Sequence, residues 1–353
     1  MLTKARYSVK DMLQWTRWEL IGFIIFSSII TVLHQLFDFT FFKIPWTPVA
    51  VVGTAVAFII GFQNNAAYGR IWEARKIWGG IVNTSRSWGM KTKDMITNEY
   101  TEEKVPEERL IQERKTMVYR HIAWLTALRH AMRSPKKWEV FEYHRTNREW
   151  SKMMHIPERD ISLEEAISPY LSKEEQAYIL QKNNKAAAIL YLQSGHLRQL
   201  KEQKLLWEFS FLDLENVLQE LFTLQGKSER IKNFPYPRQY ATLSHYFVLI
   251  FVILLPFAII PEFSGIGDKI ATKYPIIGFN FVWLAVPFYT IVSWIFHTMQ
   301  RIGTVGENPF EGSANDVPIS TISRGIEIDL RQLLDEEVDQ IPKQFKEQFD
   351  VQM

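Results

Sequence analysis

Charge is absent from four long stretches of this chain. Residues 20–37, 45–62, 242–261 and 276–296 contain no Asp, Glu, Lys or Arg, although these residue types make up 23% of the 353-residue sequence. Each stretch is long enough to cross a hydrocarbon core of about 30 Å as a helix that rises about 1.5 Å per residue. The pattern therefore predicts four transmembrane helices, with the charged sequence outside the membrane.

Aromatic residues at the ends of these stretches favour membrane helices over the alternative, which is four buried core helices of a large soluble protein. Trp and Tyr concentrate at the two membrane–water interfaces, where their rings have one apolar and one polar side. The residues in such places are Trp15, Trp18, Trp46, Tyr240, Tyr246, Tyr274 and Trp294.

Basic residues beside the predicted spans indicate how the chain is oriented. They cluster in the N-terminal arm, after the second span and before the third, whereas the loop between the first two spans has only Lys43. The positive-inside bias puts both termini and the long middle region in the cytoplasm. We therefore divide the chain into an N-terminal arm with two spans (1–62), a cytosolic helical region (63–239), two further spans (240–298) and a cytosolic C-terminal segment and tail (299–353).

The middle region is helical by pattern. Ser162 with Glu165, and Ser172 with Glu175, have the spacing of capping boxes at helix starts. Apolar residues at helical intervals predict one helix over 185–225 that ends at Gly226, a residue that forms a left-handed cap without strain. No Pro follows the second span, which predicts that its helix continues far into the cytoplasm. We expect a short amphipathic helix over 326–338, with a frayed polar end after it.

Composition excludes several kinds of chemistry. The chain has no Cys, and its net charge is +2, which gives no case for nucleic acid as a partner. Phosphate-binding loops and the common hydrolase and metalloprotease motifs are missing from the sequence. Ionisable residues within the spans are limited to His34 and His245, so a proton-relay carrier is disfavoured. We predict no enzyme activity, no catalytic residue, no metal site and no cofactor.

The second span has features of a pore-lining helix. Thr54, Phe58 and Phe62 lie one helical turn apart on a single face, and Asn64 and Asn65 follow where a pore would open into water. An aromatic stripe with this spacing also occurs in ordinary core packing, so both readings stay open at this point. Four spans cannot readily enclose a pore within one subunit, so a channel would require a symmetric oligomer.

Four blocks of sequence resemble the bestrophin family of ion channels, especially its bacterial branch. The first is Phe-Ile-Ile-Gly-Phe-Gln-Asn-Asn-Ala-Ala-Tyr-Gly-Arg-Ile-Trp-Glu-Ala-Arg-Lys-Ile-Trp over 58–78, continued by Asn-Thr-Ser-Arg-Ser-Trp over 83–88. The others are Glu-Arg-Ile…Pro-Tyr-Pro…Tyr within 226–240, and Glu-Asn-Pro-Phe with Asn-Asp-Val-Pro within 307–318. The blocks occur in the family's order and spacing over about residues 1–335. The motif residues are Asn64, Asn65, Arg70, Trp72, Glu73, Arg75, Trp78, Glu229, Arg230, Pro235, Pro237, Asn308, Pro309, Phe310, Asn315 and Asp316.

The resemblance implies an all-α membrane protein that assembles as a homopentamer around a central pore, in the bacterial inner membrane. It implies four transmembrane helices and a large cytosolic helical region per subunit, with the lipid bilayer and permeant ions as further partners. The family's three-residue hydrophobic neck maps onto Thr54, Phe58 and Phe62, where Thr54 replaces a branched aliphatic residue. Counting back from Tyr240 places a second, cytosolic aperture at Leu218.

Animal members of the family hold calcium with acidic residues just after the Asn-Pro-Phe motif. Only Glu311 and Asp316 are acidic there, too few for a cation that takes six or more oxygen ligands, so we expect no calcium requirement. We expect Asn315 and Asp316 to cap a helix over 322–334. Chloride and other anions, or monovalent cations, both remain possible permeant ions. A membrane-anchored scaffold or receptor without a pore, and a small-molecule carrier, remain alternatives to a channel.

Overall fold

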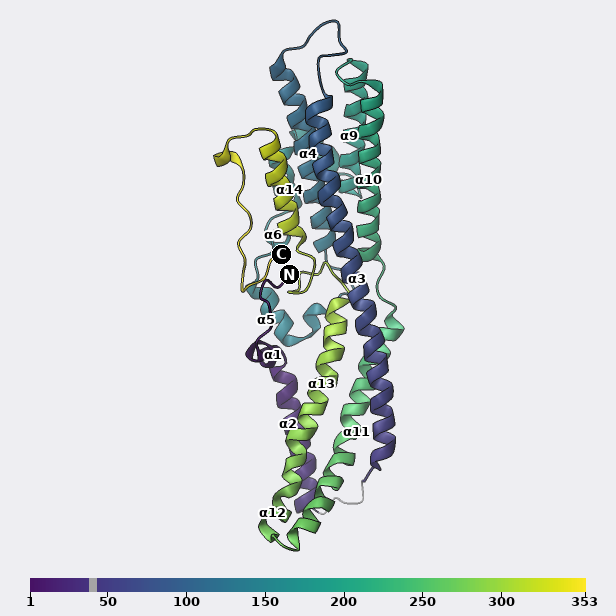
Figure 1. The fold of residues 1–353 in the computed structure, drawn as a ribbon, viewed down its shortest axis with the longest axis vertical. Coiled ribbons are helices and arrows are strands. Elements are labelled where there is room, and N and C mark those ends of the chain that lie inside the picture. The colour runs from purple at the N-terminus through teal and green to yellow at the C-terminus, as the bar shows by residue number, and fades with distance from the viewer. Residues whose placement is uncertain (38–42) are drawn as a thin grey trace.

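The structure, a computed structural model, describes residues 1–37 and 43–353, and it is an elongated stack of two helical layers (Figure 1). The lower layer contains the four predicted spans. They are α2 (Arg17–Leu36), the first part of α3 (Trp46–Met95), α11 (Arg238–Ala271), and α12 (Pro275–Asn280) with α13 (Ala285–Gly306). All four are long and apolar enough to cross a membrane, which confirms the prediction made from the charge-free stretches.

The upper layer is built from the middle of the chain and the segment after the fourth span. Its longer helices are α4 (Glu107–Arg133), α9 (Lys185–Glu202), α10 (Glu208–Asn233) and α14 (Ile319–Leu333). Short helices connect them and lead into the first span: α1 (Val9–Trp15), α5 (Arg145–Met153), α6 (Pro157–Asp160), α7 (Leu163–Ile167) and α8 (Lys173–Leu180). Within the described ranges the only extended-chain pairing is two isolated bridges, so the chain is all-α as predicted.

Helix α3 joins the two layers. It runs for 50 residues without a break, which at about 1.5 Å per residue is about 75 Å. Its apolar first half packs on α11 and α13, and its polar second half packs on α10 and α14 (Figure 1). The prediction that the second span continues as one helix into the polar region is confirmed.

Each layer has its own apolar core. In the lower layer, Val49, Val56 and Ile60 of α3 pack with residues of α11 and α13, and α11 comes so close to α3 that a Cβ at Gly53 would lie 2.7 Å from Phe251 Cε2. In the upper layer the core is centred on large side chains such as Trp78, which is fully buried. Burial of α3 in both cores fixes its rotation about its own axis.

The single helix expected over 185–225 is wrong. Helix α9 ends at Glu202 and α10 starts at Glu208, while Gly226 lies inside α10. The turn has Lys204 at φ 55°, and the Lys204 and Leu205 amides donate to the carbonyls of residues 201 and 200. This is the hydrogen-bond pattern of a Schellman motif, formed here without glycine, and burial of Leu205 and Leu206 holds it in place.

The C-terminal segment also differs from expectation. Helix α14 begins after Pro318, which has no side-chain cap, so Asn315 and Asp316 do not cap it. The tail does not fray, because Val351 and Met353 are buried against Met154 and Ile156. The two chain ends meet there, through a bridge between residues 2 and 351 (Figure 1).

Candidate functional site

One face of α3 is free of contacts within the protomer. Phe58 and Phe62 are 66% and 72% exposed and Thr54 is also exposed, whereas Val56 and Ile60, on the opposite side, are buried to 2% and 1%. The Thr54 hydroxyl donates to the Ala50 carbonyl at 3.0 Å, so its polar group is satisfied by its own helix. The structure thus places the three predicted neck residues together on one unpacked face.

The two asparagines that follow have different surroundings. Asn65 is exposed on the same face as Phe62. Asn64 is half-buried against α13, where a Cβ at Gly303 would lie 2.4 Å from Asn64 Oδ1. The apolar face therefore becomes polar one turn after Phe62, toward the upper layer, and the close approach of Gly303 fixes α13 at this level.

A buried carboxylate, Glu307, ties α13 to α3 and α11 at the end of the predicted neck that faces the upper layer. Gln63 Nε2 donates to Glu307 Oε1 at 3.0 Å, and Arg238 Nη2 lies 3.6 Å from Glu307 Oε2. Burial raises the pKa of Glu307, while the hydrogen bond from Gln63 and the nearby Arg238 and Arg70 partly offset that effect. The sequence placed Glu307 in a motif but gave it no role, because its partners come from two other helices, α3 and α11.

Other motif residues of the first block hold α3 to its neighbours. Arg70 Nε donates to the Glu307 carbonyl at 2.7 Å, and Arg70 Nη2 donates to the carbonyls of Ile231 and Phe234 at 2.9 and 3.0 Å. Glu73 forms an ion pair with Arg230 of α10. These contacts fix the join between α10 and α11 against α3.

Three aromatic or basic motif positions on α3 differ in burial. Trp72 is exposed and stacks on Tyr68, with ring centroids 6.3 Å apart. Trp78 is fully buried, with its ring 6.4 Å from that of Phe310 in the Asn-Pro-Phe motif. Arg75 is exposed. The motif therefore combines core residues with residues on a free surface.

The second block serves the α9–α10–α11 connections. Glu229 Oε1 accepts hydrogen bonds from Asn184 Nδ2 and Gln225 Nε2, both at 2.8 Å, and Asn184 is the N-cap of α9. Pro235 lies in the short link after α10, and Pro237 is the N-cap of α11. Leu218, the residue predicted for a cytosolic aperture, is 5% exposed within the upper core of the protomer.

The Asn-Pro-Phe block forms a turn closed by its own side chains. Asn308 Nδ2 donates to Glu311 Oε1 at 2.6 Å, and Pro309 precedes the buried Phe310. Asp316 Oδ2 accepts from the Gly312 and Ser313 amides at 2.6 and 3.0 Å.

The surroundings of this turn are buried and charged. Arg133 Nη1 donates to the Phe310 carbonyl at 3.1 Å, and Asn315 Oδ1 accepts from the Tyr7 hydroxyl at 3.3 Å. Burial, together with the neighbouring carboxylates Asp316 and Glu139, raises the pKa of Glu311 to about 8. Among the residues that the structure describes, no group of three or more His, Asp or Glu side chains is arranged to hold a metal.

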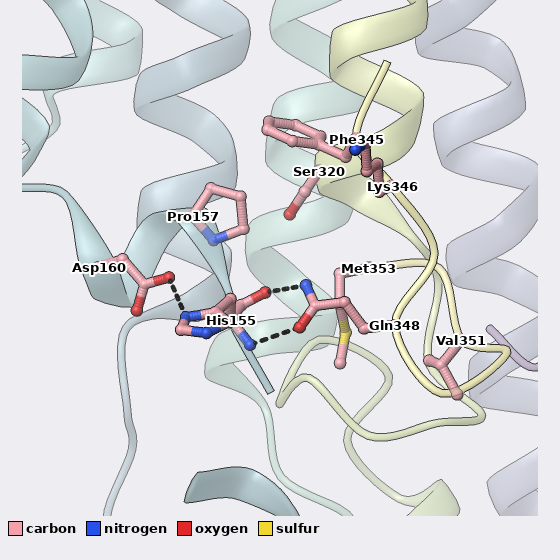
Figure 2. A pocket seen from close by; sticks show the side chains of 9 residues that line it. All are labelled: His155, Pro157, Asp160, Ser320, Phe345, Lys346, Gln348, Val351 and Met353. Atoms are coloured by element: carbon pink, nitrogen blue, oxygen red, sulfur yellow. Dashed lines mark hydrogen bonds and ion pairs between the residues drawn. The ribbon is translucent and has the colours of Figure 1, made fainter. Parts of the chain in front are cut away.

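A pocket lies apart from α3, between the tail and the segment that precedes α6 (Figure 2). Its lining includes Ser320, Lys346 and Met353. The His155 amide donates to Gln348 Oε1, and Gln348 Nε2 donates back to the His155 carbonyl, both at 2.9 Å. None of the site residues predicted from the sequence lines this pocket.

Comparison with known proteins places these features in context. A family model described as Bacterial/Fungal Bestrophin protein matches residues 8–332. The chain is 26% identical over 309 residues to the voltage-dependent anion channel-forming protein YneE of Escherichia coli strain K12, covering 87% of this chain and 83% of that protein. It is 28% identical over 290 residues to the voltage-dependent anion channel-forming protein RSc3414 of Ralstonia nicotianae, covering 82% and 78%.

The fold is similar to a crystal structure of a bacterial bestrophin homolog from Klebsiella pneumoniae. The TM-score is 0.70 at 21% sequence identity, and the alignment covers 91% of this chain and 98% of that one.

Proposed function

This chain belongs to the bacterial and fungal bestrophin family, and from that premise we propose that it is a homopentameric ion channel whose pore runs along α3. The protein is a membrane protein with four transmembrane helices per subunit. In the proposed assembly five copies of α3 surround one axis, and the cytosolic layer encloses the inner part of the pathway. Both chain ends lie beside the cytosolic layer, which supports a cytoplasmic location for both termini (Figure 1).

The observation that carries the proposal is the free face of α3. Two large aromatic side chains, Phe58 and Phe62, are left unpacked on a helix whose opposite side is buried in two cores. Lipid could cover the apolar part of this face. The face continues past Phe62 into Asn65 and on into the polar half of the same helix, however, which suits a water-filled lumen better.

In the proposed pore, Thr54, Phe58 and Phe62 form the neck. Rings of five phenylalanine side chains make an apolar constriction that can gate by losing its water. The Thr54 hydroxyl makes the outer end of the neck easier to wet than the branched aliphatic residue expected there. Anions are the favoured permeant ions, supported by the names of the relatives as anion channel-forming proteins.

A second constriction in the cytosolic layer stays a prediction. For Leu218 to line the lumen, its side chain would have to leave the protomer core, where it is 5% exposed. Leu212 and Phe209 on the same helix are 50% and 64% exposed, so they are further candidates for this aperture. Replacing each of these three residues with alanine, one at a time, and measuring ion flux would show which of them forms the aperture.

The test is conduction by the purified protein. We expect the detergent-solubilised protein to be an assembly of five 41.6 kDa subunits. In reconstituted membranes under a KCl gradient, its reversal potential should be shifted from zero toward the chloride equilibrium potential. Phe58→Ala combined with Phe62→Ala widens the neck and should raise flux about tenfold or more, because a dry constriction becomes wet. Phe288→Ala, which removes a 54% exposed ring from α13, is the matched control and should leave flux unchanged.

Two results would contradict the proposal. One is a protein of variable oligomeric state that carries no current, as expected for an anchored scaffold. The other is unchanged flux in a correctly assembled double variant of the neck.

A further inference from the structure

Two lysines, Lys76 of α3 and Lys227 of α10, lie opposite each other on these two packed helices. The helices run antiparallel, and Glu73 of α3 pairs with Arg230 of α10. Farther along, a Cβ at Gly80 would lie 2.9 Å from Leu224 Cδ2. Between these two contacts the same register sets Lys76 opposite Lys227, and both side chains are exposed.

Lys76 lies on the free face of α3. It follows Phe58 by 18 residues, which is five full turns of a helix with about 3.6 residues per turn. It follows Phe62 by 14 residues, or about 21 Å along the axis. Between Phe62 and Lys76 this face carries the exposed and uncharged Asn65, Gly69 and Trp72, and Glu73, whose side chain is 43% exposed and paired with Arg230 of α10. Lys76 is therefore the first unpaired charged residue on this face on the cytosolic side of the neck.

Most other basic residues of α3 and α10 have partners in the protomer. The contacts are Arg86 with Asp329, Lys91 with Asp213, Lys93 with Asp335, Arg230 with Glu73, and Lys232 with Glu139. In the described part of the chain, Lys76 and Lys227 have no carboxylate within 4.0 Å, and Glu73, the nearest acid in the register, is already paired with Arg230. Their charges are therefore not neutralised within the protomer. Arg75, another α3 cation without an ion pair among the described residues, points about 100° around the helix away from Lys76.

We propose that Lys76 and Lys227 form a ring of ammonium groups that holds small inorganic anions in the pathway just inside the neck. The inference rests on the proposed pentameric channel, in which five subunits contribute ten amines. Exposed ammonium groups are compact, hydrated charges, so they attract anions without binding them tightly. That combination suits conduction, in which an ion must enter a site readily and leave it again. A lumen with low-dielectric walls strengthens such a field.

The experiment compares Lys76→Gln, Lys227→Gln and the double variant with the wild-type protein in reconstituted membranes. We expect the double variant to have a reversal potential closer to zero under a KCl gradient. Its conductance should be about twofold or more lower than wild type at about 0.1 M KCl, and equal to wild type at about 1 M, where the Debye length falls from about 10 Å to about 3 Å. Each single variant should show part of the effect. Lys343→Gln removes one positive charge from the tail and is the control, with no expected change.

Three results would overturn the ring. A double variant that assembles as the wild type does and keeps its reversal potential and salt dependence shows that these lysines do not act on the ion. A loss of conductance that is equally large at about 1 M shows a structural effect and not an electrostatic one. A wild-type reversal potential that is shifted toward the potassium equilibrium potential excludes accumulation of anions in the pathway. Wild-type protein that carries no current overturns the channel as well, so the two failures are distinguishable.

Discussion

Removing the Glu307 carboxylate should loosen the contact of α13 with α3 and α11 on the upper-layer side of the neck. The side chain is fully buried, accepts a 3.0 Å hydrogen bond from Gln63 and lies 3.6 Å from Arg238. Breaking a fully buried ion pair costs about 3–5 kcal/mol, because the remaining charge is left unpaired. Arg238 is 37% exposed, however, and part of its charge is screened by solvent. Gln63 keeps a 3.3 Å contact with Thr304.

We therefore expect Glu307→Ala to destabilise the protein by about 2–3 kcal/mol. Glu307→Gln retains an acceptor for Gln63 and loses only the half-exposed ion pair, so it should cost about 1 kcal/mol or less. Thermal unfolding in detergent, followed by tryptophan fluorescence, should place the midpoint of the alanine variant about 3–6 °C below wild type and that of the glutamine variant close to wild type.

A double-mutant cycle with Gln63→Ala tests whether this hydrogen bond is the cause. If it is, the double variant loses less than the sum of the two single changes, with a coupling of about 1 kcal/mol or more. The reasoning is refuted if Glu307→Ala unfolds at the same temperature as wild type, or if the effects of Glu307→Ala and Gln63→Ala are strictly additive.

Two further predictions concern the Asn-Pro-Phe turn and the tail. The pKa of Glu311 in the folded protein is about 8, above its ordinary value of 4.5, so between these pH values the folded state binds a proton that the unfolded state has lost. The stability that this proton contributes is therefore lost as pH rises from about 4.5 through 8. Glu311→Gln should flatten this part of the stability–pH curve relative to wild type, and parallel curves of the two proteins would contradict the prediction. Val351→Asp puts a charge into a site that is 3% exposed, and it should make the tail sensitive to limited proteolysis while the four-span core stays intact. The control Phe349→Asp, at a position that is 65% exposed, should not have this effect. Equal cleavage of the two variants would show that burial of Val351 does not hold the tail.

Sequence reasoning was strongest where one local property decides the structure. A charge-free stretch of 18 to 21 residues has few alternatives to a membrane helix, so the four spans followed from composition alone. The unbroken α3 followed from the lack of a helix-breaking residue after its first turn. That Thr54, Phe58 and Phe62 share one face followed from helical periodicity, whereas only the structure showed that this face is unpacked in the protomer.

It was weakest where a distant contact decides the outcome. The break between α9 and α10 has no Gly or Pro, and it exists because Leu205 and Leu206 become buried when the chain reverses. The polar tail is ordered because two apolar side chains, Val351 and Met353, reach a site more than 190 residues away in sequence. The depth of Leu218 in the protomer core likewise depends on how α10 is rotated against α3.

The sequence by itself determined how many helices lie in the membrane, which end of α3 is polar and which residues share its free face, because these follow from composition and from the period of a helix. Only the tertiary structure decided which polar groups are neutralised. Glu307 is bound by partners from separate helices, Asp316 closes its own turn, and Lys76 and Lys227 are left unpaired at one level. Charge pairing depends on distances of a few ångströms between segments far apart in the chain, and no local pattern encodes those distances.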